Sequence, residues 1–328
     1  MPEHGGNLRD ARRLYGRTDW IDLSAGLNPD WYPAPALADN AWHRLPEPDP
    51  ALVEAACSYY GAPHMLAVAG TQAAIQALPR LRAPSRIVIA APSYAEHAHH
   101  WALHGHTATQ VAYDALAAAV DRCDVLVVCN PNNPTGATVP RALLLDWAGT
   151  LAERGGWLVV DEAFGDTDGA NSVADCTDRP GLIVLRSVGK FFGLAGVRLG
   201  FVAAQPALLD ALDELLGPWQ VSGPAQQVGK AALLDRAWQR ATHAALLLAG
   251  QRLRTLLAAH GVDSTGTALF QWWPEARPEL FHEHMARRGI WVRLFRTGPR
   301  GIRLGLPPDE AAWTRLATAL NEWTRESK

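Results

Sequence analysis

Short, uniformly apolar runs alternate with longer helix-like stretches through the middle of the chain. Apolar runs that carry no polar alternation are typical of strands buried on both faces of a parallel sheet. They lie at 86–90, 124–129, 157–163, 181–187 and 197–204. The helix-like stretches between them, such as 140–155, suit crossover helices. The pattern therefore predicts an α/β fold with three layers and a mostly parallel central sheet.

The pattern changes near residue 220, where long helical periodicity replaces the short runs. A stretch at 224–261 has the length of a helical spine between two domains. Beyond it, strand-like runs and two further helices predict a small C-terminal α+β domain. We therefore expect an N-terminal arm that joins the small domain and the active site, then a large and a small domain, at 1–40, 41–220 and 221–328.

Composition narrows the classes of function. The 328 residues are 48% hydrophobic and 19% charged, which is ordinary for a folded chain and unlike a disordered one. The formal net charge is −3, so the chain lacks the concentrated basic field that nucleic acids and anionic membranes attract. We expect a small-molecule partner, and neither a nucleic acid nor a membrane.

The cysteines and the N-terminus predict a compartment. Cys57, Cys123, Cys129 and Cys176 form no CxxC pair and have no histidine cluster at metal-ligand spacing. We expect free thiols in a reducing compartment and no metal site. The first ten residues carry charges and glycines where a signal peptide needs an apolar core, which predicts a cytoplasmic protein.

The stretch SVGKFFGLAGVRLGF at 187–201 places Lys190 between small residues, with Ser187 before it and Arg198 after it. A lysine that attacks a carbonyl cofactor needs a site that lowers the pKa of its ammonium group. A single lysine after a strand is more often a solvated loop residue. The neighbouring motifs decide between the two interpretations.

Three motifs supply groups that a phosphorylated pyridine cofactor would need. Asp161 ends an apolar run, where a buried carboxylate favours a cationic partner such as a pyridinium, although it could also cap the next helix. NPNNPTG at 130–136 is a rigid turn that holds asparagine donors. At 67–75, AVAGTQAAI places Gly70 and Thr71 before a helix, where an anion could bind; the alternative is a plain helix cap.

The motifs resemble the fold-type-I, pyridoxal-phosphate-dependent aminotransferases of class I/II, in particular the histidinol-phosphate aminotransferase branch. Seven occur in the family order: GTQAAI, PSYAEH, NPNNPTG, DEAF, SVGKFFGLAGVRLGF, VRLF and IRLGLP. The resemblance implies pyridoxal 5'-phosphate as cofactor, a homodimer, and three catalytic residues: Lys190 as the Schiff-base lysine, Asp161 as the pyridine partner and Tyr94 as the stacking ring. The further implied cofactor contacts are Gly70, Thr71, Gln72, Asn133, Ser187 and Arg198.

Other residues bear on the substrate. By resemblance, Arg303 binds the α-carboxylate and Arg293 binds a substrate phosphate. The openings HGGN (4–7) and DLSAGLNP (22–29) resemble a branch of decarboxylases that act on L-threonine O-3-phosphate in cobalamin biosynthesis. In that resemblance His4, Gly26 and Asn28 also contact the substrate. The alternative interpretation of HGGN is a flexible tail.

Two departures from the aminotransferase pattern accompany this resemblance. Phe164 stands where many transaminases have a tyrosine that reaches the ring oxygen, and Leu45 stands where a tyrosine usually reaches the partner's cofactor phosphate. We expect decarboxylation to (R)-1-amino-2-propanol O-phosphate and CO2. The alternative is histidinol-phosphate transamination with 2-oxoglutarate. A catalytically retired scaffold is disfavoured, because the lysine, the aspartate and both arginines are present.

Overall fold

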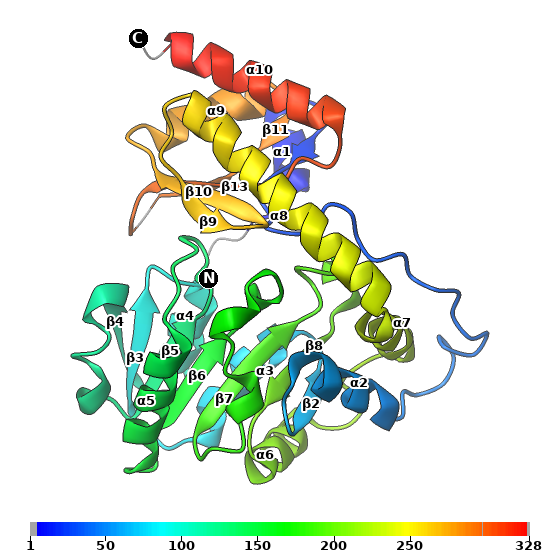
Figure 1. Cartoon of the computed structure of the whole chain (residues 1–328), viewed down its shortest axis with the longest axis vertical. Helices are drawn as coiled ribbons and strands as arrows, with labels where there is room; N and C mark the ends of the chain where they lie inside the picture. Colours follow the sequence, from blue (N-terminus) through cyan, green and yellow to red (C-terminus); the bar gives the residue numbers. More distant parts are fainter. Residues whose placement is uncertain (1–4, 297, 327–328) are drawn as a thin grey trace. The chain divides into compact units, whose positions relative to one another are not determined.

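The computed structural model describes residues 5–296 and 298–326 and divides the chain into two compact units (Figure 1). The large unit comprises 31–133 and 137–240, and the small unit comprises 134–136 and the described parts of 1–30 and 241–328. These bounds differ from the expected boundary at 220, because helix α7 (Gly223–Leu234) packs against helix α2 (Pro50–Tyr60) within the large unit.

A seven-stranded sheet forms the centre of the large unit, in the order β2-β8-β7-β6-β5-β3-β4. Strands β3 to β7 pair in parallel, whereas β8 is antiparallel to both neighbours. The strands are β2 (Met65–Val68), β3 (Arg86–Ala91), β4 (Thr107–Ala112), β5 (Val125–Cys129), β6 (Trp157–Asp161), β7 (Leu182–Ser187) and β8 (Gly200–Ala203). The expected α/β fold with a mostly parallel sheet is confirmed. The predicted runs do not include the two edge strands: β4 is largely exposed, and β2 has only four residues, two of them partly exposed.

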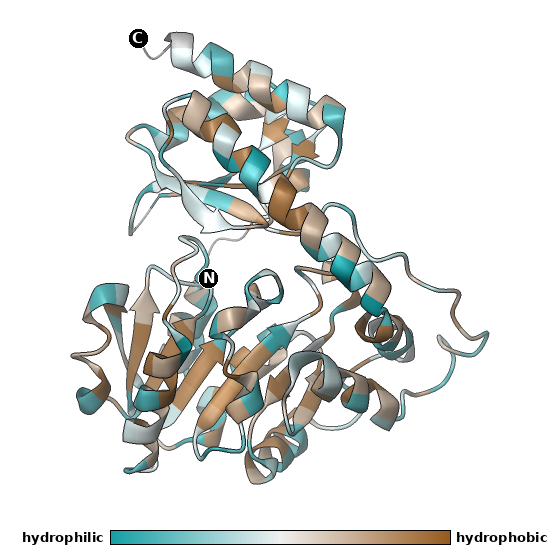
Figure 2. Ribbon diagram, viewed as in Figure 1, coloured by the Kyte–Doolittle hydropathy of each residue, from teal (hydrophilic) through white to brown (hydrophobic). Residues whose placement is uncertain are grey.

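Both faces of the sheet are covered. Val125, Val127 and Val159 belong to a core cluster that also contains residues of helices α3 and α6. The alternate residues Leu126 and Leu158 point to the opposite face by the two-residue period of a strand, and they are equally buried. The central strands accordingly appear as hydrophobic bands (Figure 2). The other helices of this unit are α3 (Thr71–Ala77), α4 (Ala95–Leu103), α5 (Arg141–Ala152) and α6 (Pro206–Leu216).

The small unit combines two sheets with helices. Strands β12, β13, β10 and β9 form an antiparallel sheet in that order, and β1 pairs with β11 in parallel, which ties the N-terminal arm to the C-terminal part of the chain. The strands are β1 (Ile21–Asp22), β9 (Thr265–Thr267), β10 (Phe270–Pro274), β11 (Ile290–Trp291), β12 (Arg293–Phe295) and β13 (Gly301–Gly305). The helices are α1 (Leu8–Tyr15), α9 (Pro278–Arg287) and α10 (Glu310–Glu326).

The predicted continuous spine at 224–261 is wrong in one respect, because the helix breaks at Asp235. There α7 ends, and α8 (Arg236–Ala259) begins and runs on into the small unit. Asp235 Oδ1 accepts a hydrogen bond from the backbone N–H of Trp238 at 2.9 Å, and such a cap starts a new helix.

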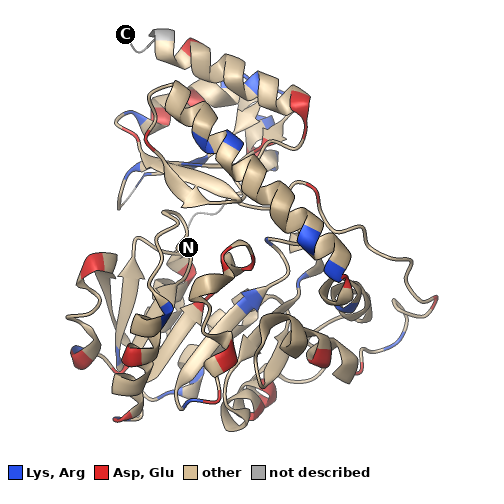
Figure 3. Cartoon of the chain, in the orientation of Figure 1, with Lys and Arg blue, Asp and Glu red and all other residues tan. Residues whose placement is uncertain are grey.

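Charges are interspersed over both units, with acidic and basic residues side by side on helices and loops (Figure 3). No helix among the described residues is both long enough and apolar enough to cross a bilayer.

Candidate active site

The carboxyl ends of the parallel strands of the large unit surround a pocket. Loops at this edge of a parallel sheet commonly form ligand sites. All nine residues expected to contact the cofactor line it: Gly70, Thr71, Gln72, Tyr94, Asn133, Asp161, Ser187, Lys190 and Arg198. The structure thus brings together side chains that are spread over 129 positions, from 70 to 198, in the sequence.

One end of the pocket is a tight cradle around the start of α3. Gly70 has φ 75°, and a Cβ atom there would lie 2.6 Å from Nη2 of Arg198. A Cβ on Gly200 of β8 would lie 2.7 Å from the backbone nitrogen of Thr71. Only glycine lets the guanidinium and the first N–H groups of α3 come this close. These donors and the nearby Ser187 hydroxyl suit a phosphate group.

Asp161 lies at the end of β6 with 6% of its surface exposed. Its Oδ1 accepts a hydrogen bond from the backbone N–H of Ala163 at 3.0 Å, and its Oδ2 lies 3.0 Å from Nε2 of His97. Cys129 is its register partner on β5 and also lines the pocket. The carboxylate is therefore fixed on its strand with a histidine behind it, as a partner for a pyridinium must be.

His97 itself is almost completely buried, on α4. Burial opposes its charged form, but the hydrogen bonds with Asp161 and Cys129 outweigh that effect and raise the pKa of His97 to about 10. His97, Cys129 and Asp161 place one possible metal-ligand atom each within 4.8 Å of one another. This pKa keeps the imidazole protonated at neutral pH, so His97 donates to the carboxylate and we interpret the cluster as an anchor for Asp161.

Replacing His97 by glutamine is expected to lower the free energy of unfolding by about 1.5–3 kcal/mol at pH 6, the usual value of a hydrogen bond to a charged group. Because the folded-state pKa exceeds the unfolded value of 6.5, this contribution is complete below about pH 6.5 and disappears as the pH rises through 10. Urea unfolding of the cofactor-free protein at pH 6, 8 and 10 measures it. The same change at the exposed His64 should have no such dependence, and a difference that grows with pH would contradict the assignment.

Lys190 follows β7, and its Nζ lies 5.3 Å from the centre of the Phe164 ring, a cation–π distance. Phe164 is 5% exposed and lines the pocket beside Asp161 and Ala163. A phenyl ring offers no hydroxyl, so this position contacts the lysine without donating a hydrogen bond.

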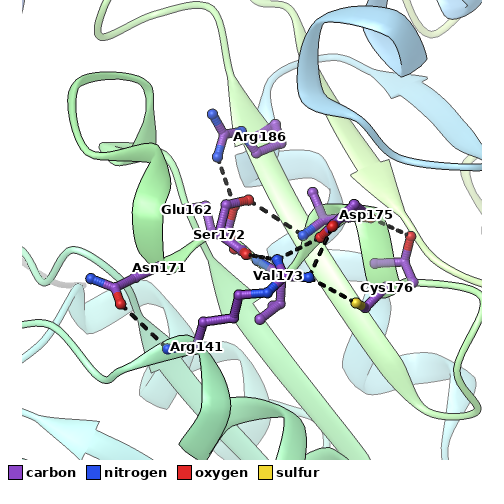
Figure 4. A network of polar contacts seen from close by, with 10 residues as sticks. Arg141, Glu162, Asn171, Ser172, Val173, Asp175, Cys176 and Arg186 are labelled. Atoms are coloured by element: carbon purple, nitrogen blue, oxygen red, sulfur yellow. Dashed lines mark hydrogen bonds and ion pairs between the residues drawn. The ribbon is translucent and has the colours of Figure 1, made fainter.

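A buried ionic network supports the strands that carry these residues (Figure 4). Glu162, next to Asp161, accepts hydrogen bonds from Arg186 Nη1 and Ser172 Oγ, both at 2.6 Å. Arg186, next to Ser187, also lies 3.2 Å from Asp166. Because alternate residues of a strand point to opposite faces, the network behind the sheet fixes the ends of β6 and β7 that present Asp161 and Ser187.

The expected substrate residues belong to the small unit. Arg293 and Arg303 lie directly opposite each other on the antiparallel strands β12 and β13. Burial, together with the positive charge of Arg293, lowers the pKa of Arg303 to about 10. Two like charges in such positions destabilise a sheet, so the pair favours a bound anion.

Of the residues expected in the N-terminal arm, Asn28 is buried and its Oδ1 accepts a hydrogen bond from the backbone N–H of Asp30 at 2.9 Å, and Gly26 is also buried. His4 lies outside the described residues.

Sequence reasoning missed three residues at this site: Glu96, His97 and Cys129. The first two belong to PSYAEH, in which only Tyr94 received a role. The signal was available, because Tyr94 and His97 are three residues apart and would share one face of a helix. Their ring centres lie 6.1 Å apart in the structure.

The sequence and the fold have counterparts in known proteins. The family model "Aminotransferase class I and II" matches residues 18–320. A threonine-phosphate decarboxylase of Pseudomonas aeruginosa is 52% identical over 323 residues, which cover 98% of this chain and 97% of that protein. Another, from Sinorhizobium sp, is 42% identical, with 97% of each chain covered. The crystal structure of histidinol-phosphate aminotransferase from Sinorhizobium meliloti, in complex with pyridoxal-5'-phosphate, has a TM-score of 0.83 at 23% identity and covers all of this chain and 96% of that chain.

Proposed function

We propose that this chain, which belongs to the class I and II aminotransferase family, is a pyridoxal-phosphate-dependent decarboxylase of L-threonine O-3-phosphate. The assignment of the substrate rests on one observation: the chain is 52% identical, over nearly the whole of both chains, to a threonine-phosphate decarboxylase. The product is (R)-1-amino-2-propanol O-phosphate, which would supply the aminopropanol arm of cobalamin.

The pocket residues fit the cofactor. The cradle of Gly70, Thr71 and Arg198 would hold its phosphate, Asp161 its pyridine nitrogen and Lys190 its carbonyl carbon. When bound, pyridoxal 5'-phosphate supplies an electron sink for the pair that remains when CO2 leaves. The fit rests on the anchored carboxylate and on the glycine that leaves room for the guanidinium.

The residues of this chain perform the other steps. Asp161, with His97 behind it, would hold a proton on the pyridine nitrogen of the bound cofactor, which would keep the ring cationic. Arg303 binds the substrate carboxylate and Arg293 its phosphate, which accounts for two guanidinium groups on neighbouring strands. The Cα–carboxylate bond breaks, CO2 leaves, and Lys190 gives a proton to Cα.

We also propose that the protein is a cytoplasmic homodimer. Several large apolar side chains of the large unit are highly exposed for a monomer, among them Trp31, Trp42, Leu45 and Trp219. Trp42 is 76% exposed and Leu45 is 64% exposed. Exposed apolar groups favour association with another protein surface, here a second copy of the chain.

The deciding experiment supplies L-threonine O-3-phosphate to the cofactor-loaded protein without a keto acid and follows CO2 release. Release of CO2 together with aminopropanol phosphate is the expected result. Amino transfer from histidinol phosphate to 2-oxoglutarate, with no CO2 release, would instead assign the protein to transamination.

Replacing Arg293 by alanine is expected to lower kcat/KM for L-threonine O-3-phosphate roughly 10- to 100-fold, the value of a charge-assisted hydrogen bond to a phosphate. Decarboxylation of unphosphorylated L-threonine, however slow, should change little, because L-threonine has no phosphate for Arg293 to bind. Steady-state kinetics with both substrates measure the ratio. Equal losses for the two would refute the phosphate role of Arg293.

A further inference from the structure

A chain of hydrogen bonds runs from the pocket into the protein behind it. Tyr94 Oη donates to Gln72 Oε1 at 3.1 Å, and Gln72 Nε2 donates to Glu96 Oε2 at 2.8 Å. Glu96 Oε2 also lies 3.0 Å from Nε2 of His100. Tyr94 and Gln72 line the pocket, whereas Glu96 is 6% exposed and does not line it.

The direction of these hydrogen bonds follows from chemistry. A carboxylate only accepts hydrogen bonds, so Glu96 must face the NH2 group of the Gln72 amide. The carbonyl oxygen of that amide then faces Tyr94, whose hydroxyl must donate. Glu96 lies in the first turn of α4, where the helix dipole favours its charged form. Burial first, and then the charge of Glu96, raise the pKa of Tyr94 to about 12, so the hydroxyl keeps the proton that it donates.

We propose that Glu96 is a positioning residue, which fixes the amide of Gln72 and through it the hydroxyl and ring of Tyr94 against the cofactor. Without the carboxylate, the Gln72 amide could rotate by half a turn and present its NH2 group to Tyr94. The tyrosine would then lose its fixed acceptor, and its ring would lose the contact that sets its tilt. This proposal rests on the proposed function and on the role that the family resemblance implies for Tyr94, as the ring that stacks on the cofactor.

The test is a double-mutant cycle of Glu96→Gln and Tyr94→Phe, with the dissociation constant of pyridoxal phosphate and the visible circular dichroism of the bound cofactor as readouts. Glu96→Gln keeps the size of the side chain and removes its charge. We expect it to weaken cofactor binding about tenfold in the native background and less than about twofold in the Tyr94→Phe background. We also expect both single variants to alter the dichroism band in the same sense.

Two further variants test whether the effect of Glu96 reaches Tyr94 through Gln72. Gln72→Leu interrupts the chain but keeps the charge of Glu96, so it should reproduce the effect even if Glu96→Gln unfolds the protein. His100→Gln removes the contact between Glu96 and His100 and should leave cofactor affinity within about twofold. Equal effects of Glu96→Gln in both backgrounds, or a His100→Gln variant as impaired as Glu96→Gln, would overturn the proposal.

These readouts need no substrate. If they behave as expected and no CO2 is released, the positioning role stands and the proposed decarboxylation fails. If CO2 is released but the cycle shows no coupling, the decarboxylation stands and the role of Glu96 fails.

Discussion

Replacing Lys190 by alanine is expected to abolish CO2 release, with a loss of at least about 10³-fold. The variant should also lose the visible absorption band of the lysine-linked cofactor. The physical reason is that this amine is proposed both to bond to the carbonyl carbon and to return a proton to Cα. Absorption spectra of the purified protein and a CO2 assay measure the two effects separately.

The chain offers a matched control for this experiment. It has only three lysines, of which Lys190 and Lys230 lie within the described residues. Lys230 pairs with Asp49 and does not line the pocket. Replacing Lys230 by alanine should leave the visible absorption band of the cofactor and the CO2 release intact. If the Lys190→Ala protein kept the visible absorption band and released CO2, the role assigned to Lys190 would be wrong.

Replacing Arg186 by methionine is expected to lower the free energy of unfolding by about 3–5 kcal/mol, because it leaves buried acids without their cation. The Arg186 side chain is 5% exposed, and those of Glu162 and Asp166 are each 1% exposed. Although burial opposes its charge, these two carboxylates hold the pKa of Arg186 above its ordinary value. Urea unfolding of the cofactor-free protein measures the loss.

An exposed ion pair provides the comparison. Arg13, with a side chain 75% exposed, lies 3.3 Å from Asp10 on α1, and its replacement by methionine should cost less than about 1 kcal/mol. If the two arginine variants lose equal stability, the buried network is not a determinant of the fold. Cofactor affinity of Arg186→Met should also fall, because β6 and β7 carry Asp161 and Ser187.

Local composition was enough to predict the central strands, and the expected cofactor residues came from the resemblance of seven motifs to a known family. Each strand of the large unit that the sequence predicted is an apolar run, because it is buried on both faces and tolerates no polar alternation. Asp161 and Ser187 lie at the ends of such runs, at the edge where parallel strands end together. The edge strands β2 and β4 were not predicted. For β4 the reason is that exposure on its open side removes the apolar signal.

Contacts between distant segments could not be predicted in the same way. The break at Asp235 depends on one side chain that caps α8. The helical periodicity of the sequence gives no sign of this cap. The opposition of Arg293 and Arg303 depends on the register of two strands, and a slip of one residue would send one of them to the other face.

The sequence by itself determined the central strands, since these depend on local composition. Its motifs, through their resemblance to a known family, supplied nine of the residues that line the pocket. Tertiary structure alone decided how those residues are held. His97 anchors Asp161 and Glu96 fixes Gln72 through contacts across 64 and 24 positions of sequence. Hydrogen bonds over such separations depend on side-chain placement to within about 0.5 Å, which only the packed fold provides.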